Sequence, residues 1–356
     1  MKSILKYILL WLVVVMVLVG GLLILASFLT HSSAGADLLR LDDQEATIRA
    51  IKKAIPGVVS IVVSQDKNRI GAGSGFLISA DGLILTNKHV ASAVVDGPAE
   101  YKVTLYSGKQ YFAQLIGVDP LDDLAVLKIF DKNLPYLQLG DSNSLVAGMS
   151  VVAIGNALGR YDNSATKGII SGLGRSLTAS GNNGQSEDLQ NVIQTDAEIN
   201  FGNSGGPLIN LNGDVIGVDV ARDDGGASLG FAIPVNEAKP IIQSVRATGR
   251  IIRARLGVRY KIITPEMADQ QKLPRSTGAL ITLGEHNEAA ISDGSPAAAA
   301  GLQADDIIFE IDGKKIDERL PLQSYIAQFS PGKKLGLKIQ RGTQIFTKIV
   351  TLDELK

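Results

Sequence analysis

The residues with the clearest chemical potential lie between Gln194 and Ile209, in the stretch QTDAEINFGNSGGPLI. At its centre Ser204 stands among glycines, which let a backbone turn tightly and approach a substrate closely. A serine hydroxyl is a weak nucleophile unless a base activates it and a further group orients that base. The chemistry of this stretch therefore depends on finding those two groups elsewhere in the chain.

Few residues can supply the base, because the chain contains only three histidines, His31, His89 and His286. His89 directly follows one apolar run, and Asp123 directly precedes another. The order His, Asp, Ser is one of the known orders of a catalytic triad. The residue types and their order favour acyl transfer, with His89 as general base and acid and Asp123 as the carboxylate that orients it.

Composition excludes several other classes of protein. The chain has 356 residues and a formal net charge of −1, which gives no reason to expect nucleic acid as a partner. It contains no cysteine, so a thiol nucleophile, disulfides and cysteine-based metal sites are excluded. The chemistry described above needs no metal and no organic cofactor, and we expect neither.

Short apolar runs separated by turn residues dominate the chain from residue 55 to about 245. Strands at this spacing with little helix between them favour a closed all-β barrel or a pair of barrels. The glycine-rich run at 71–78 lacks the Lys-Ser/Thr that closes a phosphate-binding loop, so we interpret it as a strand. The predicted strands are 58–63, 71–78, 83–86, 102–106, 111–118, 124–129, 150–154, 166–171, 192–195, 207–209, 215–220 and 230–233.

A helix is predicted at 236–248, where Gly249 provides the stop. The pattern then changes to a mixture of strands and short helices, which is typical of a small α+β domain. We therefore expect one domain at 55–248 and a second at 252–354.

The N-terminal residues predict a membrane anchor at 1–30. Residues 7–30 contain no charged side chain, and a helix of that length spans about 36 Å, enough for a hydrocarbon core of ~30 Å. A cleaved signal peptide is the alternative, because small residues follow at 33–36, although its apolar region is usually only ~7–15 residues long. The lysines before the apolar run place the N-terminus in the cytoplasm and the rest outside. Residues 31–54 are interpreted as a linker with a helical pattern in its second half.

The region from about 55 to 245 resembles the HtrA (Deg) family of chymotrypsin-like serine proteases. The resemblance rests on the motifs TNKHV, DDLAVLKI, AIGNALG, GIISGLGR, QTDAEIN, GNSGGPL and GFAIP. The region from about 255 to 352 resembles the PDZ domain of that family, through LGV, GSPAAAAGL and DDIIFEIDG. The resemblance implies an all-β double barrel, a small α+β PDZ domain and assembly into a homotrimer.

The resemblance also implies Ser204 as the nucleophile, with His89 and Asp123 in the roles given above. Of the two adjacent acids, Asp123 matches the family pattern better than Asp122. The oxyanion hole would comprise the backbone N–H groups of Gly202 and Ser204, with Asn203 as an additional contributor.

One residue beside that hole departs from the family pattern, because Phe201 stands where the family usually has proline. This departure is expected to alter the stiffness of the loop, but it leaves the donor groups themselves in place.

The pocket for the side chain before the scissile bond has two candidate residues in this chain. Glu198 would select Lys or Arg, whereas Ile199 would select a small or medium aliphatic side chain. The resemblance favours Ile199. The other wall of the pocket is expected to comprise Leu229, Gly230, Phe231 and Ala232.

Regulation is predicted at two places. Arg175 matches a family arginine that relays activation from the PDZ domain, although an ordinary surface arginine is an equal alternative, and the loop 178–187 is interpreted as mobile. A PDZ domain binds C-terminal peptides by adding them as a strand to a sheet edge. The backbone of Leu256, Gly257 and Val258 would hold the terminal carboxylate.

These features predict a membrane-anchored serine endopeptidase whose catalytic domain lies outside the cytoplasm. Its expected substrates are unfolded or misassembled proteins, and peptide binding at the PDZ domain is expected to control its activity. Two alternatives stay open: a catalytically silent peptide-binding scaffold and a chaperone-like holdase.

Overall fold

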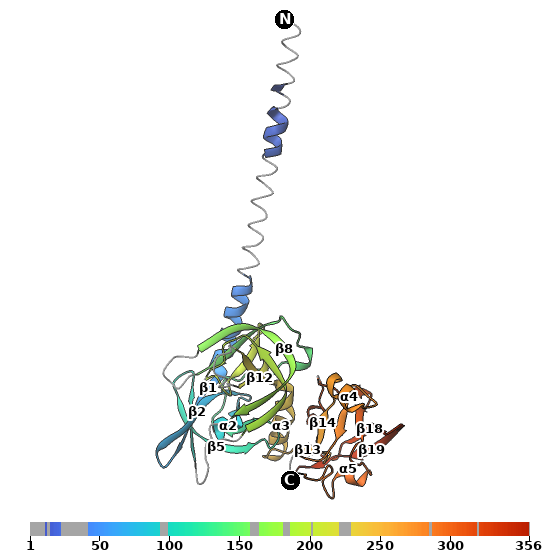
Figure 1. Cartoon of the computed structure of the whole chain (residues 1–356). Coiled ribbons are helices and arrows are strands. Elements are labelled where there is room, and N and C mark those ends of the chain that lie inside the picture. Colours follow the sequence, from blue (N-terminus) through green and yellow to red (C-terminus); the bar gives the residue numbers. More distant parts are fainter. Residues whose placement is uncertain are drawn as a thin grey trace. The chain divides into compact units, whose positions relative to one another are not determined.

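The computed structural model describes residues 11–12, 15–22, 42–92, 99–156, 164–180, 186–200, 202–220, 229–284, 287–318 and 320–355. The chain divides into two units, Met1–Arg49 and Ala50–Lys356, and Figure 1 shows the strands and helices of the second unit with their labels. Most of the expected membrane span, together with His31 and His286, lies outside the described residues. Within the described ranges, no helix combines the length and the apolar character needed to cross a bilayer.

Six antiparallel strands form a first closed barrel in the order β1-β2-β3-β6-β5-β4. Closure leaves no unpaired strand edge, which suits a chain of short strands with many turns. Alternate residues of the first strand, Val59, Ile61 and Val63, are fully buried in one apolar cluster. The strands are β1 (Val58–Gln65), β2 (Asn68–Leu77), β3 (Leu83–Thr86), β4 (Glu100–Leu105), β5 (Gln110–Val118) and β6 (Ala125–Lys128).

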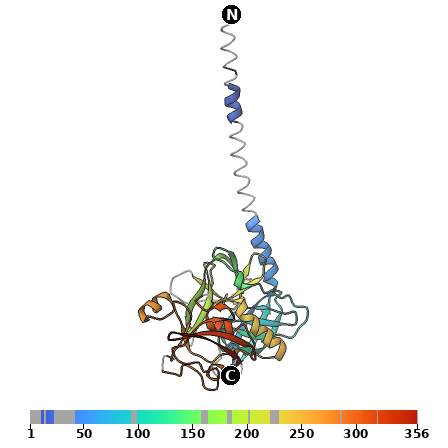
Figure 2. The same cartoon turned by 90° about the vertical axis from the view of Figure 1, so that its right-hand side faces the viewer.

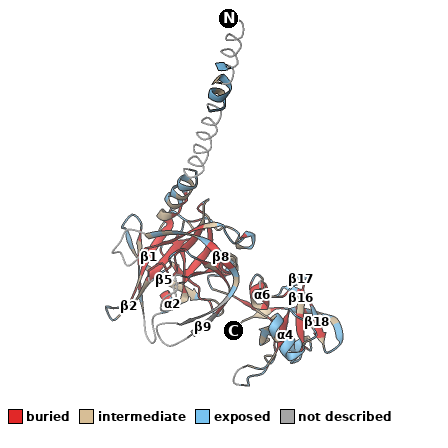
Figure 3. Ribbon diagram, turned by 45° about the horizontal axis from the view of Figure 1, so that its top comes forward, coloured by how far each residue is buried: buried red, intermediate tan, exposed pale blue. Residues whose placement is uncertain are grey.

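A second closed barrel has the order β10-β11-β12-β9-β8-β7. Figure 3 shows buried residues in red along the barrel strands. The two barrels confirm the predicted fold class for this region. The strands are β7 (Ser150–Gly155), β8 (Ser164–Ser180), β9 (Ser186–Thr195), β10 (Pro207–Asn210), β11 (Val215–Val220) and β12 (Gly230–Pro234).

The expected strand at 166–171 is much longer in the structure, because β8 continues to Ser180 and pairs with β9 as far as Ser186. The prediction of a mobile loop at 178–187 was therefore wrong for its two ends, and only 181–185 lies outside the described residues. Glycine and serine have low strand propensity, so local sequence did not indicate a strand that its partner stabilises.

Helix α3 (Val235–Thr248) packs its apolar face against a cluster that includes residues of both barrels, Phe76 from the first and Val218 from the second. It ends at Gly249, whose φ of +77° is the left-handed conformation that glycine adopts readily. A further helix covers 42–54, and Ala54 at its end is buried in the same cluster. Lys53, in the last turn of this helix, donates to Asp214 Oδ1 at 2.9 Å, which holds the end of the helix to the second barrel.

The C-terminal region is a mixed α+β domain, and Figure 2 shows its strands in orange and red. Its main sheet has the order β14-β15-β16-β18-β19, so β14 (Tyr260–Ile262) is an edge strand. The other strands of this domain are β13 (Ala254–Arg255), β15 (Ala279–Ile281), β16 (Ile307–Ile311), β17 (Lys314–Lys315), β18 (Lys334–Arg341), β19 (Gln344–Thr351) and β20 (Asp353–Glu354). Its helices are α4 (Pro265–Gln271), α5 (Pro296–Ala299) and α6 (Leu322–Ile326).

Candidate active site

His89 lies on the short helix α2 (Lys88–Ala91), which follows β3 after one residue, and Asp123 lies two residues before the start of β6. The His89 ring Nδ1 is 2.6 Å from Asp123 Oδ2, and the His89 backbone N–H donates to Asp123 Oδ1 at 2.8 Å. One carboxylate therefore holds both the ring and the backbone of the histidine. An imidazole whose Nδ1 proton faces a carboxylate carries its basic lone pair on Nε2, which is the arrangement a general base requires.

The neighbouring acid, Asp122, does not contact the imidazole in any interaction the structure describes. Its Oδ2 accepts from Arg253 Nη2 at 2.6 Å. The Asp123 backbone carbonyl accepts from Asn87 Nδ2 at 2.9 Å, so a residue two before His89 fixes the turn that carries the acid. Of the two adjacent acids, the structure places Asp123 against His89.

The turn that carries Ser204 lies between β9 and β10 of the second barrel, and it is bound to the first barrel through Ser74 of β2. The Ser74 N–H donates to the Ser204 carbonyl at 2.8 Å, and the Ser74 hydroxyl donates to the Gly202 carbonyl at 2.5 Å. The Ser74 carbonyl accepts from Thr86 Oγ1 at 2.7 Å, and Thr86 ends the strand that leads to His89. These bonds bring the predicted nucleophile to the same place as the predicted base.

Two glycines allow this close approach. A Cβ on Gly73 would lie 2.7 Å from Val90 Cγ2, and 2.9 Å from the Ser204 carbonyl oxygen. Gly205 has a φ of +82°, and its Cβ would lie 2.3 Å from both the Ser74 carbonyl oxygen and Thr86 Oγ1. A larger residue at either position would force the two barrels apart beside the predicted catalytic groups.

The predicted oxyanion donors lie in the same turn. Gly202 has a φ of +118°, and Phe201 before it lies outside the described residues, so the shape of the hole stays a prediction. The Asn203 side-chain amide donates to the Glu198 carbonyl at 3.2 Å, and its Oδ1 accepts from Ser164 Oγ at 3.3 Å. That side chain is thus bound within the second barrel, which leaves backbone N–H groups as the candidates for stabilising an oxyanion.

The two candidate pocket residues differ in burial. Ile199 is buried and covers Gly230, where an added Cβ would lie 2.9 Å from Ile199 Cδ1. Glu198 is exposed and accepts from Asn200 Nδ2 at 2.6 Å. The structure therefore places the apolar side chain, and not the acid, in the wall of the second barrel.

The expected second wall is divided between two environments. Ala232 is fully buried in the apolar cluster that contains Ile199, whereas Phe231 packs in the cluster around α3. Leu229 is 42% exposed. Only Gly230 and Ala232 of the predicted wall therefore share a face with Ile199, and the role of this wall in binding stays a prediction.

Asp219 is a buried acid beside the Ser204 turn that sequence reasoning missed. Its N–H donates to the Gly206 carbonyl at 2.8 Å, and its carbonyl accepts from the Gly205 N–H at 2.9 Å. The side chain is fully buried, and neither carboxyl oxygen has a hydrogen-bond partner in the part of the chain that the structure describes. Burial raises the pKa of Asp219 well above its ordinary value. A single acid inside the apolar run VIGVDV was the available signal.

Arg253, which lies between α3 and β13, is a second residue that the sequence did not indicate. Its side chain is 1% exposed, its Nε donates to Asp119 Oδ1 at 2.9 Å, and its Nη1 donates to the carbonyl of Ala327, at the end of α6, at 3.4 Å. Burial raises the pKa of Asp122 and also that of Glu237, which interact with the same guanidinium. One buried arginine thus connects the loop that carries Asp123 to the C-terminal domain.

Arg175 is exposed on β8 and folds back along its own strand. Its Nε lies 3.0 Å from the position that a Cβ on Gly172 would occupy. No described contact joins its side chain to the C-terminal domain, and its role as a relay stays a prediction.

The backbone carbonyls of the predicted carboxylate loop accept hydrogen bonds from residues outside the loop, which fixes its shape. The Leu256 carbonyl accepts from the Ala297 N–H at 2.9 Å, and the Gly257 carbonyl accepts from the Ser292 N–H at 3.0 Å. Gly257 has a φ of +82°, and an added Cβ would lie 2.2 Å from Ser295 Cβ. The loop leads through Val258 into the edge strand β14, where a peptide strand can be added.

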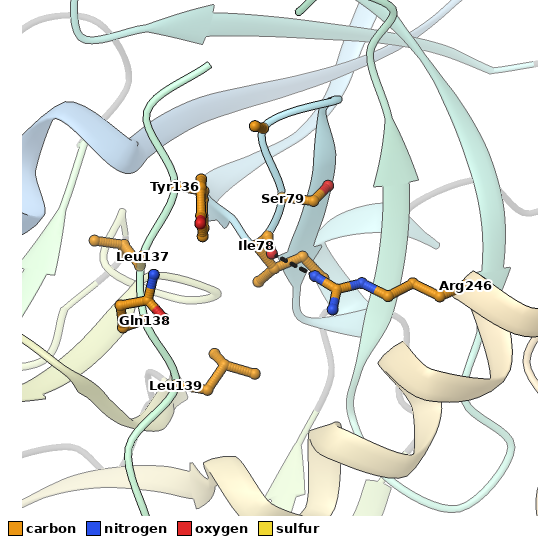
Figure 4. Close-up of a pocket in the computed structure, with 8 residues that line it drawn as sticks. Ile78, Ser79, Tyr136, Leu137, Gln138, Leu139 and Arg246 are labelled. Carbon is orange, nitrogen blue, oxygen red and sulfur yellow. Dashed lines mark hydrogen bonds between the residues drawn. The ribbon is translucent and has the colours of Figure 1, made fainter. Parts of the chain in front are cut away.

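A cavity of about 430 Å³ lies elsewhere in the unit Ala50–Lys356, between the end of β2 and α3 (Figure 4). Arg246 reaches into it and donates to the Ile78 carbonyl at 2.9 Å, and Tyr136 lines it from the facing segment. It contains none of the predicted catalytic residues, so its size does not identify it as the active site.

Residues 73–218 match the family described as "Trypsin-like peptidase domain", and residues 215–352 match the "PDZ domain" family. The second match begins within β11, but the strands of the C-terminal domain begin at Ala254, so we take that boundary from the strands. The solved structure "HtrA-type protease AlgW with tripeptide" is 34% identical, covers 87% of this chain and 97% of its own, and superimposes with a TM-score of 0.67. This chain belongs to the HtrA-type serine proteases.

Curated relatives of this HtrA-type protease agree with that assignment. "Putative serine protease HhoB" from Synechocystis sp. (strain ATCC 27184 / PCC 6803 / Kazusa) is 38% identical over 338 residues, which cover 85% of this chain and 78% of the relative. "Probable periplasmic serine endoprotease DegP-like" from Chlamydia muridarum (strain MoPn / Nigg) is 40% identical over 286 residues, or 80% of this chain. The match covers 54% of that relative, so the chain spans about half the length of the DegP-like proteins it matches. The predicted family is confirmed.

Proposed function

We propose that this HtrA-type protease hydrolyses peptide bonds with Ser204 as nucleophile, His89 as general base and acid, and Asp123 as the orienting carboxylate. The Asp123 carboxylate that holds both Nδ1 and the backbone N–H of His89 is the observation that carries the proposal. His89 Nε2 takes the Ser204 hydroxyl proton as the oxygen attacks the peptide carbonyl, and then returns it to the leaving amine. Water then attacks the carbonyl of the acyl-enzyme while His89 takes its proton, and the proton returns to Ser204 as the carboxylic acid product leaves.

The negative charge of the tetrahedral intermediate would be stabilised by the backbone N–H groups of Gly202 and Ser204. Losing one such donor typically costs about 2.7–4 kcal/mol of transition-state stabilisation. The positive φ of Gly202 and the bond from Ser74 Oγ to its carbonyl support this reading, because both constrain the backbone between the two peptides that carry these donors.

Ser204→Ala tests the proposal with an unfolded protein such as reduced casein as substrate. The wild-type chain is expected to degrade it, and the variant to leave it intact while keeping the same thermal unfolding curve. Equal degradation by both proteins would exclude Ser204 as the nucleophile. The holdase alternative is tested by the same variant, which would then suppress aggregation of the casein without cleaving it.

The proposed location is the outer side of a membrane, with the chain anchored by its N-terminal segment. The uncharged run at 7–30 and the periplasmic names of several relatives support this proposal. Sodium carbonate extraction of membranes checks whether the chain is anchored. In a separate assay, protease treatment of intact spheroplasts checks whether the catalytic domain faces outward. Release of the full-length chain into the soluble fraction would contradict anchoring, and protection from added protease would contradict the outward orientation.

The proposed regulation is activation by peptides that bind along β14 of the PDZ domain. The edge position of β14 supports it, and so does the bond network from Ala327 through Arg253 to the loop before Asp123. The HtrA-type protease AlgW has been solved with a tripeptide and with a decapeptide. Substrates in this proposal are unfolded or misassembled extracytoplasmic proteins, and the active assembly is a homotrimer.

A library of peptides with apolar C-termini tests the regulation. We expect bound peptides to raise the cleavage rate of a reporter substrate, and Arg175→Ala to reduce that increase without changing peptide affinity. Binding without any change in rate, across the library, would contradict activation through the PDZ domain.

A further inference from the structure

Asp219 occupies an unusual place, because a fully buried acid lies on the strand that directly supports the Ser204 turn. Its backbone bonds to Gly205 and Gly206 fix its position relative to the predicted nucleophile. A buried polar group without a partner destabilises a fold, so retaining one beside a catalytic turn needs a reason outside folding.

The strand register places Asp219 on the same face as the wall described above. Asp219 of β11 is directly paired with Ala232 of β12, and Ala232 is directly paired with Ile193 of β9. Directly opposite residues of antiparallel strands point to the same side of the sheet. Gly230 lies two residues before Ala232 and therefore also on this face, where Ile199 covers it.

The neighbours of Asp219 on this face are small. Gly217 lies two residues before it on the same strand, and an added Cβ there would lie 3.0 Å from the Ala232 Cβ. Gly230 and Ala232 contribute no side chain larger than a methyl group. Small residues around a carboxyl without a partner are the arrangement expected where another molecule supplies the missing contact.

We propose that Asp219 is a specificity-determining residue, which selects substrates with a short hydroxyl-bearing side chain, threonine or serine, immediately before the scissile bond. The proposal rests on the proposed function, since it assumes that Ser204 is the nucleophile. It also changes the aliphatic preference expected from Ile199 alone, because a polar group ends the apolar wall.

Two properties of the site favour a short neutral side chain over lysine or arginine. The Ile199 side chain covers Gly230 and so limits how far a long side chain can extend. A cation would also have to be desolvated together with a carboxylate in an apolar wall, and that penalty often exceeds the gain from pairing. A protonated carboxyl, by contrast, both donates to and accepts from a hydroxyl group.

The test uses two pairs of quenched fluorescent peptides that differ only before the scissile bond: threonine against valine, and serine against alanine. Threonine and valine have nearly the same shape, so their ratio of kcat/KM isolates the hydroxyl group. For the wild-type chain we expect ratios on the order of tenfold in favour of the hydroxyl, about the effect of one hydrogen bond. Ratios of one or less in both pairs would overturn the proposal without using any variant.

Two substitutions sharpen the test. Asp219→Val should bring the threonine-to-valine ratio to about one, whereas Asp219→Asn, which keeps a donor and an acceptor in the same shape, should retain most of it. An unchanged ratio in Asp219→Val would overturn the proposal. Titration with a fluorophosphonate corrects each rate for the fraction of active protein, and Ser204→Ala is measured in parallel. Cleavage by Ser204→Ala would instead contradict the proposed function, so the two failures are distinguishable.

Discussion

The guanidinium of Arg253 is buried against the carboxylate of Asp119, with Nε 2.9 Å from Oδ1, in the loop that ends at Asp123. The arginine belongs to the connection between the second barrel and the PDZ domain, and the aspartate belongs to the first barrel. The ion pair thus joins this connection to the first barrel at the base of the loop that carries Asp123, and the bond from Arg253 Nη1 to the Ala327 carbonyl adds the PDZ domain.

Arg253→Met is expected to destabilise the protein strongly, because it leaves Asp119 fully buried and Asp122 partly buried without their cation. Breaking a buried pair in this way typically costs about 3–5 kcal/mol. Urea unfolding of the catalytically inactive Ser204→Ala background measures the change without self-cleavage. Arg250→Met is the matched control, because Arg250 pairs with Glu354 at the surface and should be replaceable with little effect. Similar losses for both variants would contradict the buried role of Arg253.

Asp123→Asn and Asp122→Asn distinguish the two adjacent acids. The first should lower kcat by roughly 10⁴-fold, because an amide no longer holds the imidazole in the tautomer that accepts the serine proton. The second should leave kcat within a few-fold, because Asp122 faces Arg253. Measured rates with one fluorescent peptide decide between them, and a larger loss in Asp122→Asn would reverse the assignment.

Gly205→Ala should abolish activity and destabilise the fold, since its Cβ would lie 2.3 Å from two oxygen atoms of the first barrel. Gly148→Ala is the control: Gly148 also has a positive φ, +92°, but its Cβ would meet nothing within 4 Å. The control should cost only the left-handed strain of about 1–2 kcal/mol and keep its activity. If the two variants unfold alike and both stay active, the close approach of the barrels at Gly205 is not required.

Asp219→Asn should change how stability depends on pH. Burial raises the pKa of Asp219 in the folded state, so between about pH 4 and that raised pKa the folded protein binds more protons than the unfolded chain. The free energy of unfolding of the wild type therefore falls as pH rises through this range, and the contribution of Asp219 is complete only below about pH 4. The asparagine variant lacks this loss, so its stability relative to wild type should increase with pH. Parallel curves for the two proteins would show that Asp219 does not titrate differently in the two states.

Local sequence predicted most of the barrel strands and the positions of His89, Asp123 and Ser204, because turn residues and apolar runs are local features. It did not predict Arg253, because a basic residue in the connection RIIRARL looks solvated until the fold surrounds it with Asp119 and Asp122. Asp219 was missed for a related reason, since only the pairing of β11 with β12 shows what its side chain faces. The sequence also predicted a strand much shorter than β8, because pairing with β9 holds its glycines and serines in a strand.

The division of the triad between the barrels has a consequence for synthesis. His89 and Asp123 belong to the first barrel, whereas Ser204 comes from the second, and Lys53 before the first barrel pairs with Asp214, which is translated later still. With the triad proposed above, a chain that is interrupted before Gly202 contains His89 and Asp123 but lacks Ser204. Such a truncated product would have no nucleophile, and peptidase activity would require a chain whose two barrels have both been made.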